Sequence, residues 1–423
     1  MKIKAPRGTV DILPDEIENY KYVQRVAAET ARVFGFSEIS TPVFEHTELF
    51  ERGVGDTTDV VQKEMYTFPD KSERSITLRP EGTASVARAY LEHSLYALPA
   101  PVKLFYDITC YRYEKPQTGR LREFHQFGAE VFGTAEPSID AEIIAFVNSI
   151  FKNIGIKNLV LNINSIGCPS CRKEFNAALT EYLKSNYDSL CTTCHGRLER
   201  NPMRVLDCKN KSCKQIAEGA PAILDFICTD CRSHFEEVQK LLNAVGISYN
   251  IDPSIVRGLD YYTRTVFEFV STEIGAQGTV CGGGRYDNLI ELLGGGEIPG
   301  IGFAMGIERI ILVMKAQGIV PKVSKRPDVY IASAGEGGAV LSLVCGLRDA
   351  GVYAECDHAG RSLKAQMKNA GRMGARFSMV IGGDEVVAGK ANIKNMDDGT
   401  VAQTGLDILS IKNNLSQGTK EDE

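Results

Sequence analysis

The sequence lacks the long apolar segments that place a protein in or across a membrane. No apolar stretch follows its first lysines, as a secretory signal would require. No segment reaches the roughly 18 apolar residues of a membrane span. Positive charge is not in excess either, since the formal net charge is −6. We therefore expect a cytoplasmic protein without membrane contact, in which any binding of nucleic acid depends on local basic patches.

The glycine-rich loops that usually bind nucleotides are also missing. Residues 383–390 have the wrong spacing for a phosphate-binding loop, and Ala391 follows where Ser or Thr is required. The glycines at 282–284 do not match the dinucleotide fingerprint. A nucleotide-using protein with this sequence would hold the phosphates with side chains, and the fork of arginine matches phosphate oxygens.

The length of 423 residues predicts at least two domains, because a single core rarely exceeds roughly 250–300 residues. Residues 317–327 contain a glycine, two prolines, two lysines and an arginine, which is typical of a linker. We therefore expect one domain over 1–326 and a second over 327–423. In the second, short apolar runs alternate with helical patterns, which predicts an α/β domain with a largely parallel sheet. Its polar final ten residues are expected to be disordered.

Hydrophobic periodicity predicts the main elements of both domains. Predicted helices cover residues 15–34, 138–153, 302–315, 337–349 and 360–372, and another begins at Pro80. Predicted strands cover residues 36–44, 75–79, 102–113, 124–132, 263–272, 278–282, 328–333, 352–356 and 377–383. Pro42 interrupts the first of these strands and favours a sheet edge or an interface.

Eight of the twelve cysteines lie within a short segment, which we interpret as a helical insertion over 168–235. Three of the four cysteine pairs have the two-residue gap of a zinc knuckle, and two tetrahedral thiolate sites would use all eight. The alternative is an insertion with reduced thiols and no metal, and the spacing leaves both open. The candidate ligands are Cys168, Cys171, Cys191, Cys194, Cys208, Cys213, Cys228 and Cys231.

Three arginines are candidates for phosphate binding. Arg112 ends an apolar strand beside a basic loop over 114–120, although a salt bridge with Glu114 or Glu123 would also explain it. Arg309 follows Glu308 inside the apolar helix predicted for 302–315. A buried charge is costly unless it is paired or used, so a functional role is favoured there.

The third arginine, Arg257, shares a short segment with Asp260, Tyr261 and Tyr262. Adjacent tyrosines on a strand point to opposite faces, so one could pack in the core while the other lines a pocket. A turn with an arginine–aspartate pair is the alternative, and the pattern does not decide between them.

Two glutamates could recognise a group that donates hydrogen bonds, such as an imidazole. Glu81 follows Pro80, and Glu130 lies on the strand after the basic loop. Taken alone, each is better explained by a helix N-terminus or a surface position.

A basic stripe is predicted on one helix of the second domain. Its four members fall within roughly an 80° arc of a helix, and no acidic residue occurs between His358 and Gly383. Contact with RNA phosphates is favoured over a solvated helix face. The members are Arg361, Lys364, Lys368 and Arg372.

In this order, the segments resemble the class II aminoacyl-tRNA synthetases and, within them, the histidyl-tRNA synthetase family, over nearly the whole chain. The stretch around Pro42 is similar to the first class motif, which forms a dimer interface. Residues 112–124 are similar to the second motif and residues 302–309 to the third. The sequences RGLDYY at 257–262 and GGGRYD at 282–287 resemble two signatures of the histidine family, and LRPEGT at 78–83 also fits.

The resemblance implies ATP-dependent attachment of histidine to its tRNA through a histidyl-adenylate, carried out by a homodimer with ATP and Mg²⁺. The implied fold is an α+β catalytic domain with a six-stranded antiparallel sheet and flanking helices, a helical insertion and an α/β anticodon-binding domain. The family's chemistry does not require zinc, so the resemblance does not assign the cysteines.

The resemblance also implies residue roles. Arg112 and Arg257 are catalytic: Arg112 holds the α-phosphate and the carboxylate, and Arg257 supplies charge that most class II enzymes draw partly from another magnesium. The implied ATP-binding residues are Arg112, Glu114, Arg120, Phe124, which stacks on adenine, and Arg309, which holds the γ-phosphate end. The implied histidine-binding residues are Glu81, Gly82, Thr83, Arg112, Gln126, Glu130, Arg257, Tyr261 and Tyr262. Gln117 is expected to touch the tRNA acceptor end.

Two other protein classes compete with the histidyl-tRNA synthetase family as explanations of these motifs. A regulatory subunit of ATP phosphoribosyltransferase reuses this core as a histidine-binding module, but it would need neither the Arg257 signature nor the anticodon domain. Another class II synthetase would lack the two histidine signatures. Both features are present here, so neither rival is favoured.

Overall fold

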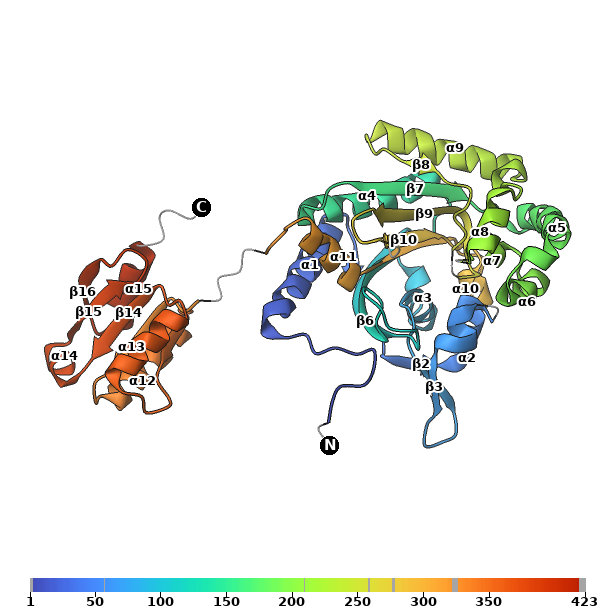
Figure 1. The fold of residues 1–423 in the computed structure, drawn as a ribbon. Helices are drawn as coiled ribbons and strands as arrows, with labels where there is room; N and C mark the ends of the chain where they lie inside the picture. Colours follow the sequence, from blue (N-terminus) through green and yellow to red (C-terminus); the bar gives the residue numbers. More distant parts are fainter. Residues whose placement is uncertain are drawn as a thin grey trace. The chain divides into compact units, whose positions relative to one another are not determined.

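The computed structural model describes residues 3–56, 58–208, 210–257, 259–275, 278–321 and 326–417. Its contacts divide the chain into two units, Met1–Pro321 and Lys322–Glu423. Each unit is built around a main sheet of its own (Figure 1). Among the described residues, none of the helices has the length and apolarity that a membrane crossing needs.

The main sheet of the first unit has eight strands in the order β1-β5-β6-β11-β10-β9-β7-β8. Its six central strands are β5 (Val102–Tyr111), β6 (Glu123–Phe132), β11 (Gly300–Gly306), β10 (Thr279–Arg285), β9 (Thr263–Ser271) and β7 (Leu159–Ser165). These six are antiparallel to their neighbours, as expected. At the two edges, β1 (Ser37–Glu38) pairs in parallel with β5, and β8 (Asn250–Ile251) pairs in parallel with β7. The six strands that the resemblance implies are these central ones, and the two-residue edge strands bring the count to eight.

Alternation along the central strands separates a helix-covered face from a pocket face. In β6, Phe127, Ala129 and Val131 enter the larger core, while Gln126 and Glu130 point the other way. The helix-covered face packs against α1 (Pro14–Val33), α4 (Pro137–Ile154), α9 (Thr229–Ala244) and α11 (Ile307–Ala316). The other face packs against α3 (Thr83–Glu92), α10 (Leu289–Leu292) and the insertion.

The helix predicted for residues 302–315 is wrong in its first half. Residues 300–306 form strand β11, and α11 begins at Ile307. Ile301, Phe303 and Met305 alternate toward the helices, whereas the residues between them are glycine or alanine. An apolar run without a breaker does not distinguish strand from helix, and here the alternation of large and small side chains was the signal.

A smaller three-stranded sheet lies beside the main one. It contains β2 (Phe44–His46), β4 (Ser75–Leu78) and β3 (Tyr66–Pro69). The helical turns between β2 and β3 are α2 (Thr47–Phe50) and the π-helical segments Glu51–Gly55 and Val60–Glu64. The single strand predicted for residues 36–44 is therefore wrong, since β1 and β2 belong to different sheets and Pro42 separates them.

The insertion is helical, as expected. It contains α5 (Pro169–Ser185), α6 (Thr192–Arg200), α7 (Met203–Leu206) and α8 (Lys211–Glu218), and it returns to the sheet along α9. Figure 1 shows α5 to α8 gathered beside one end of the sheet, with α9 running along its β7–β8 edge.

The second unit has a five-stranded sheet in the order β13-β12-β14-β15-β16. These strands are β12 (Val329–Ser333), β13 (Ala354–Cys356), β14 (Phe377–Ile381), β15 (Lys390–Asn395) and β16 (Val401–Gly405). The first three are parallel, and the last two, which were not predicted, are antiparallel. Packed around the sheet are α12 (Gly337–Asp349), α13 (Leu363–Arg372), α14 (Gly383–Ala388) and α15 (Ile408–Gln417). Disorder was predicted for 414–423, yet α15 continues to Gln417; residues 418–423 lie outside the described residues.

Candidate active site

A cavity of about 330 Å³ opens on the pocket face of the main sheet. Its floor is made of small residues, including Gly302, Ala304 and Gly306 of β11 and Gly282 of β10. Gly282 allows a close approach, because a Cβ there would lie 2.5 Å from Nη1 of Arg257. The alternating pattern that misled the helix prediction is therefore what leaves room for a ligand.

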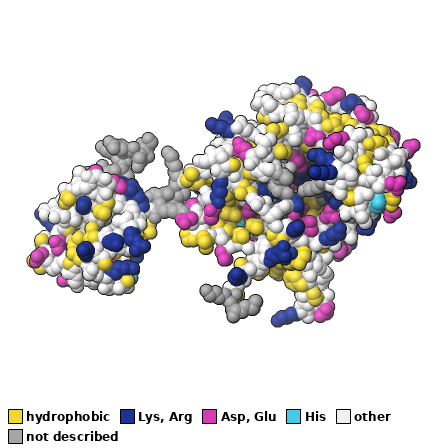
Figure 2. Space-filling model, in the orientation of Figure 1, with side chains coloured by type: hydrophobic (Ala, Val, Ile, Leu, Met, Phe, Trp, Pro, Cys, Tyr) yellow, Lys and Arg dark blue, Asp and Glu magenta, His cyan; other side chains and the backbone are white. Residues whose placement is uncertain are grey.

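The cavity brings together most of the predicted site residues, although they are spread from residue 81 to residue 309. Figure 2 shows lysine and arginine side chains gathered at a hollow in the surface of the first unit. The predicted residues that line the cavity are Glu81, Thr83, Arg112, Glu114, Arg120, Phe124, Gln126, Arg257, Tyr261, Tyr262 and Arg309.

Arg112 is held by the backbone rather than by a carboxylate. Its Nε donates to the carbonyl oxygen of Pro80 at 2.8 Å, and its guanidinium lies 5.5 Å from the ring centre of Phe124. Glu114, which we considered as its salt-bridge partner, instead pairs with Arg120 at 3.0 Å. The cavity wall thus presents a fixed guanidinium beside an aromatic face, which suits a phosphate next to a planar base.

Arg257 lies at the opposite side of the glycine floor and pairs with Glu268. Its guanidinium is 5.8 Å from the ring centre of Tyr262. The Nε of Arg257 is buried and has no hydrogen-bond partner among the described residues. Burial alone would lower the pKa of this side chain, but Glu268 and Tyr262 more than offset burial and raise it. The arginine–aspartate turn is wrong, because Asp260 pairs with Arg204 of the insertion.

Tyr261 and Tyr262 were expected on opposite faces of a strand. They instead precede β9, and both are buried at the cavity wall with ring centres 4.7 Å apart. Irregular backbone does not alternate, so both phenols can face the same ligand.

Glu308 and Arg309 do not pair with each other, because consecutive residues of a helix do not face one another. The Glu308 carboxylate accepts from the backbone and the ring Nδ1 of His125, the latter at 2.8 Å. Arg309 donates to the carbonyl oxygens of Thr279 at 2.6 Å and Gly119 at 3.3 Å. Burial and Arg120 lower the pKa of Arg309. Because Arg120 contributes to this shift, the two guanidinium groups are close to each other, and both make this side of the cavity positive.

Glu81 caps α3 and also lines the cavity. Its carboxylate accepts from the backbone N–H groups of Thr83 at 2.7 Å and Ala84 at 2.8 Å, and burial raises its pKa. The helix begins at Thr83 rather than at Pro80. Gly82 does not line the cavity, but a side chain there would collide with Tyr106. The helix-terminus interpretation of Glu81 is therefore correct and compatible with a ligand contact.

Glu130 is completely buried beneath the cavity rather than in its wall. It accepts from the hydroxyls of Thr83 at 2.8 Å and Tyr106 at 2.9 Å, and from that of Tyr286. Burial raises the pKa of Glu130 to about 8, although the three hydroxyls oppose this shift. Through Thr83 and Tyr286, which do line the cavity, Glu130 fixes the hydroxyls that a ligand meets.

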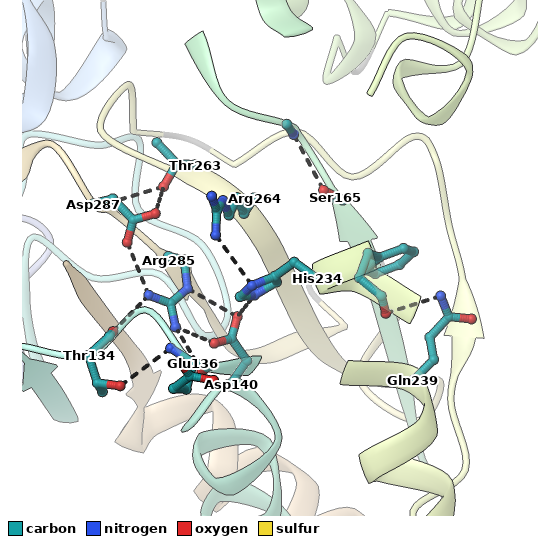
Figure 3. A network of polar contacts seen from close by, with 12 residues as sticks. Thr134, Glu136, Asp140, Ser165, His234, Gln239, Thr263, Arg264, Arg285 and Asp287 are labelled. Atoms are coloured by element: carbon teal, nitrogen blue, oxygen red, sulfur yellow. Dashed lines mark hydrogen bonds and ion pairs between the residues drawn. The ribbon is translucent and has the colours of Figure 1, made fainter. Parts of the chain in front are cut away.

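A buried network around Arg285 was not predicted (Figure 3). Arg285 is fully buried and pairs with Asp140 of α4 and, at 3.1 Å, with Asp287. The ring Nε2 of His234 in α9 donates to the same Asp140 carboxylate at 3.1 Å. Burial alone would raise the pKa of Asp140, but Arg285 and His234 lower it. The arginine of the GGGRYD signature thus joins β10, α4 and the helix that leaves the insertion, outside the cavity.

Two groups of residues predicted to contact tRNA lie elsewhere. Gln117 forms a turn with Arg120 through backbone hydrogen bonds of 3.0 and 2.9 Å and does not line the cavity. In the second unit, Lys364, Lys368 and Arg372 are exposed along α13. Arg361 precedes that helix and pairs with Asp357 at 2.7 Å, so its place in the stripe was predicted wrongly.

The eight insertion cysteines form two clusters. All twelve cysteines of the chain are free thiols. In each cluster the four sulfur atoms lie within 4.8 Å of one another. The neck cluster is Cys168, Cys171, Cys228 and Cys231, and the inner cluster is Cys191, Cys194, Cys208 and Cys213. Four convergent thiolates are the donor set that tetrahedral zinc prefers, so the arrangement fits that ion.

Comparison with known proteins identifies the family. Residues 8–310 match the family model described as histidyl-tRNA synthetase, and residues 328–416 match an anticodon binding domain. A histidine–tRNA ligase of Acetivibrio thermocellus is 57% identical over 97% of this chain and 99% of that protein. The apo histidyl-tRNA synthetase of S. aureus superposes with a TM-score of 0.83 and 40% identity, over 97% of this chain and 99% of that one.

A protein of Bacillus halodurans, described as an ATP phosphoribosyltransferase regulatory subunit/histidyl-tRNA synthetase, shares the fold with a TM-score of 0.63. It is only 23% identical, over 87% of this chain and 97% of that one, so it speaks for the architecture alone. The family match covers more than half of the chain, and the full-length relative is far more similar. The chain belongs to the histidyl-tRNA synthetase family.

Proposed function

We propose that the cavity of the first unit joins histidine to ATP and then transfers the histidyl group to tRNA. Attachment of histidine to its tRNA through a histidyl-adenylate is the activity of this ATP-dependent ligase. The observation that carries the assignment to this cavity is the convergence of Arg112, Arg257 and Arg309 on one glycine floor.

The chemical task is to bring two anions together. The histidine carboxylate attacks the α-phosphorus of ATP, pyrophosphate leaves, and the anhydride of histidine and AMP forms. Fixed cations that meet the extra negative charge at phosphorus lower the barrier without reorganisation. We assign Arg112 to the α-phosphate and the carboxylate, Arg257 to the charge that develops between them, and Arg309 to the γ-phosphate.

The remaining ATP contacts follow from the same wall. Phe124 lies beside Arg112, where an adenine could stack on its ring, and the Glu114–Arg120 pair borders it. Magnesium, when bound with ATP, would offset the negative charge of the phosphates. Carboxylate oxygens are ligands that it prefers, and Glu114 and Glu268 offer them at the cavity wall.

We assign histidine recognition to the end of the cavity formed by Glu81, Thr83, Gln126, Tyr261 and Tyr262. These side chains present carboxylate, amide and hydroxyl groups that can satisfy an ammonium group and an imidazole. Glu130 supports them from below. Because Glu130 is already bound by three hydroxyls, we expect it to act on the ligand mainly through Thr83 and Tyr286.

ATP–pyrophosphate exchange with each amino acid tests the proposal. We expect exchange with histidine and none above background with the other amino acids. Exchange that fails with histidine, or that proceeds equally with another amino acid, would contradict the assignment. A regulatory histidine-binding module would bind histidine without any exchange.

We further propose that the chain works as a cytoplasmic homodimer. Pro42, in the stretch that resembles the first class motif, borders a groove of about 1120 Å³. Leu49, Leu91, Leu293 and Ile298 give this groove apolar walls. An exposed apolar groove is typical of a protein interface, and the first class motif assigns it to a second copy.

We propose that the exposed face of α13 contacts the phosphates of the tRNA. Changing Lys364, Lys368 and Arg372 together to glutamine should raise the KM for tRNA about tenfold or more, since each lost phosphate contact weakens binding. ATP–pyrophosphate exchange should stay unchanged, because it does not involve tRNA. Arg361→Gln is the control, since Arg361 is paired with Asp357. An unchanged KM in the triple variant would make the stripe a solvated helix face.

We also propose that each cysteine cluster holds a structural zinc ion. The support is the convergence of four sulfur atoms at each site. Gln117, in the loop next to the ATP wall, remains our candidate for contact with the acceptor end of the tRNA.

A further inference from the structure

The insertion contacts a segment of the cavity wall at Asp260. Asp260 belongs to the signature loop, which we define as residues 256–257 and 259–262. Its Oδ1 accepts from the Asn201 side-chain amide at 3.0 Å and from Nη2 of Arg204 at 3.1 Å. The side chains of Arg204 and Asp260 are 11% and 25% exposed, so the pair is largely shielded from water.

The other side of Asp260 contacts the body of the unit. Its backbone N–H donates to the carbonyl oxygen of Val54 at 3.2 Å. A Cβ at Gly55 would lie 2.6 Å from Oδ2 of Asp260, so the carboxylate packs directly against this glycine turn. Asp260 is therefore held between the insertion and the segment Glu51–Gly55.

The position of Asp260 affects the ligand site because the residues on both sides of it line the cavity. Leu259 precedes it, Tyr261 follows it, and Tyr262 and Arg257 lie against one another nearby. None of these residues belongs to the regular part of the sheet, since β9 begins at Thr263. Hydrogen bonds of the main sheet therefore do not fix these residues, and the contacts of Asp260 hold the loop together with the Arg257–Glu268 pair.

The partners of Asp260 lie on the part of the insertion nearest to the inner cluster. Arg204 belongs to α7, and Asn201 lies between α6 and α7. Arg197 of α6 donates to the carbonyl oxygen of Arg204 at 3.0 Å and so ties the two helices together. Asp207, directly after α7, lines the cavity, and Cys208 of the inner cluster follows it.

We propose that Arg204 and Asn201 are positioning residues that latch the insertion to Asp260 and so set the signature loop for histidine activation. The inference rests on the proposed function of the cavity and adds the insertion to it. The latch acts through Tyr261, Tyr262 and Arg257, and neither Arg204 nor Asn201 lines the cavity. The carboxylate of the RGLDYY signature is thus used to hold the loop.

The chain offers a matched control. A second insertion arginine, Arg197, pairs at 2.6 Å with Asp59, which also belongs to the body of the unit. This bridge is similar in kind but does not touch the signature loop. Asp260→Asn and Asp59→Asn each remove one carboxylate charge opposite an insertion arginine. If the insertion only has to stay attached to the body of the unit, Asp260→Asn and Asp59→Asn should change histidine-dependent exchange to the same extent.

The test is ATP–pyrophosphate exchange measured over a range of histidine concentrations. A hydrogen-bonded charge is typically worth enough for a change of about tenfold. We expect Asp260→Asn and Arg204→Met each to raise the KM for histidine about tenfold or more and to lower kcat. Asp59→Asn should stay within about twofold of the unchanged chain. Arg204→Lys, which keeps the charge, should recover part of the loss.

The double variant Arg204→Met/Asp260→Asn separates a latch from independent structural damage. Two partners of one interaction should not multiply their effects, so the double variant should lie within about twofold of the worse single variant. Multiplying effects, or equal losses in Asp59→Asn and Asp260→Asn, would overturn the latch. Either result would leave the proposed function intact as long as the unchanged chain shows histidine-dependent exchange. If the unchanged chain shows no such exchange, the proposed function itself is overturned. Melting temperatures report whether a variant has unfolded. If Arg204→Met or Asp260→Asn has unfolded, the latch is tested by comparing Arg204→Lys with the unchanged chain.

Discussion

Replacing Arg257 by alanine should reduce histidine-dependent ATP–pyrophosphate exchange by about 10²–10³-fold, the loss typical of one preorganised charge at a reacting centre. Arg257 lies on Gly282, pairs with Glu268 and keeps its Nε without a protein partner among the described residues. This geometry aims a fixed charge into the cavity before any ligand arrives. Histidine binding, measured by calorimetry without ATP, should change by no more than about threefold, because the charge acts mainly on the transition state.

Two further variants make this prediction specific. Arg376→Ala is the matched control: its side chain is 17% exposed against 19% for Arg257, and each pairs with one carboxylate. Each also lies 5.8 Å from the centre of an aromatic ring. Arg376 belongs to the second unit, and its loss should leave exchange unaltered. The double variant Arg257→Ala/Glu268→Gln tests whether an unpaired Glu268 causes the loss. An unchanged exchange rate in Arg257→Ala would make this arginine structural, and a parallel loss of histidine affinity would make it a binding residue.

The antiparallel centre of the main sheet followed from the family resemblance, whereas alternation along the sequence predicted four of its six strands, β5, β6, β9 and β10, and missed β7 and β11. Phe127, Ala129 and Val131 pack under the helices while their neighbours face the cavity. Strand β11 was mistaken for a helix because its pocket face is formed by glycine and alanine, which have no polar side chain to reveal alternation. The residues that create the cavity are thus the ones that hid the strand.

The candidate site was predictable where one residue carries its own signal, and not where a pair of distant residues does. Arg309 stood out alone as a charge in an apolar segment, whereas Arg112 and Arg257 were assigned through the family motifs around them; all three line the cavity. Their partners did not follow from spacing. Glu308 and Arg309 are neighbours in sequence, but Glu308 contacts His125 and Arg309 contacts Thr279. The partner of Asp260 is Arg204, which belongs to the insertion and lies more than fifty residues away in the sequence. The buried Arg285–Asp140 pair escaped notice for the same reason.

Removing the metal that we assign to the neck cluster should have the largest effect on stability. The neck cluster joins Cys168 and Cys171, at the start of the insertion, to Cys228 and Cys231, where α9 begins. It closes both ends of the insertion at its root. Metal binding by thiolates contributes directly to folding free energy. We therefore expect Cys171→Ser to lower the melting temperature of the first unit by on the order of 10 °C.

The inner cluster should respond differently, because it joins only parts of the insertion to one another. Cys213→Ser should lower stability less and raise the KM for histidine, since Cys208 follows the segment that carries the latch. Elemental analysis of protein purified without chelator should give about two zinc ions per chain, falling to about one in either variant. Cys345→Ser, an exposed thiol outside both clusters, should keep both ions and the original melting temperature. Protein without zinc but with full stability would establish the clusters as reduced thiols. Equal losses of stability in Cys171→Ser and Cys213→Ser would show that the insertion folds as one unit, and that the neck cluster contributes no more to stability than the inner cluster.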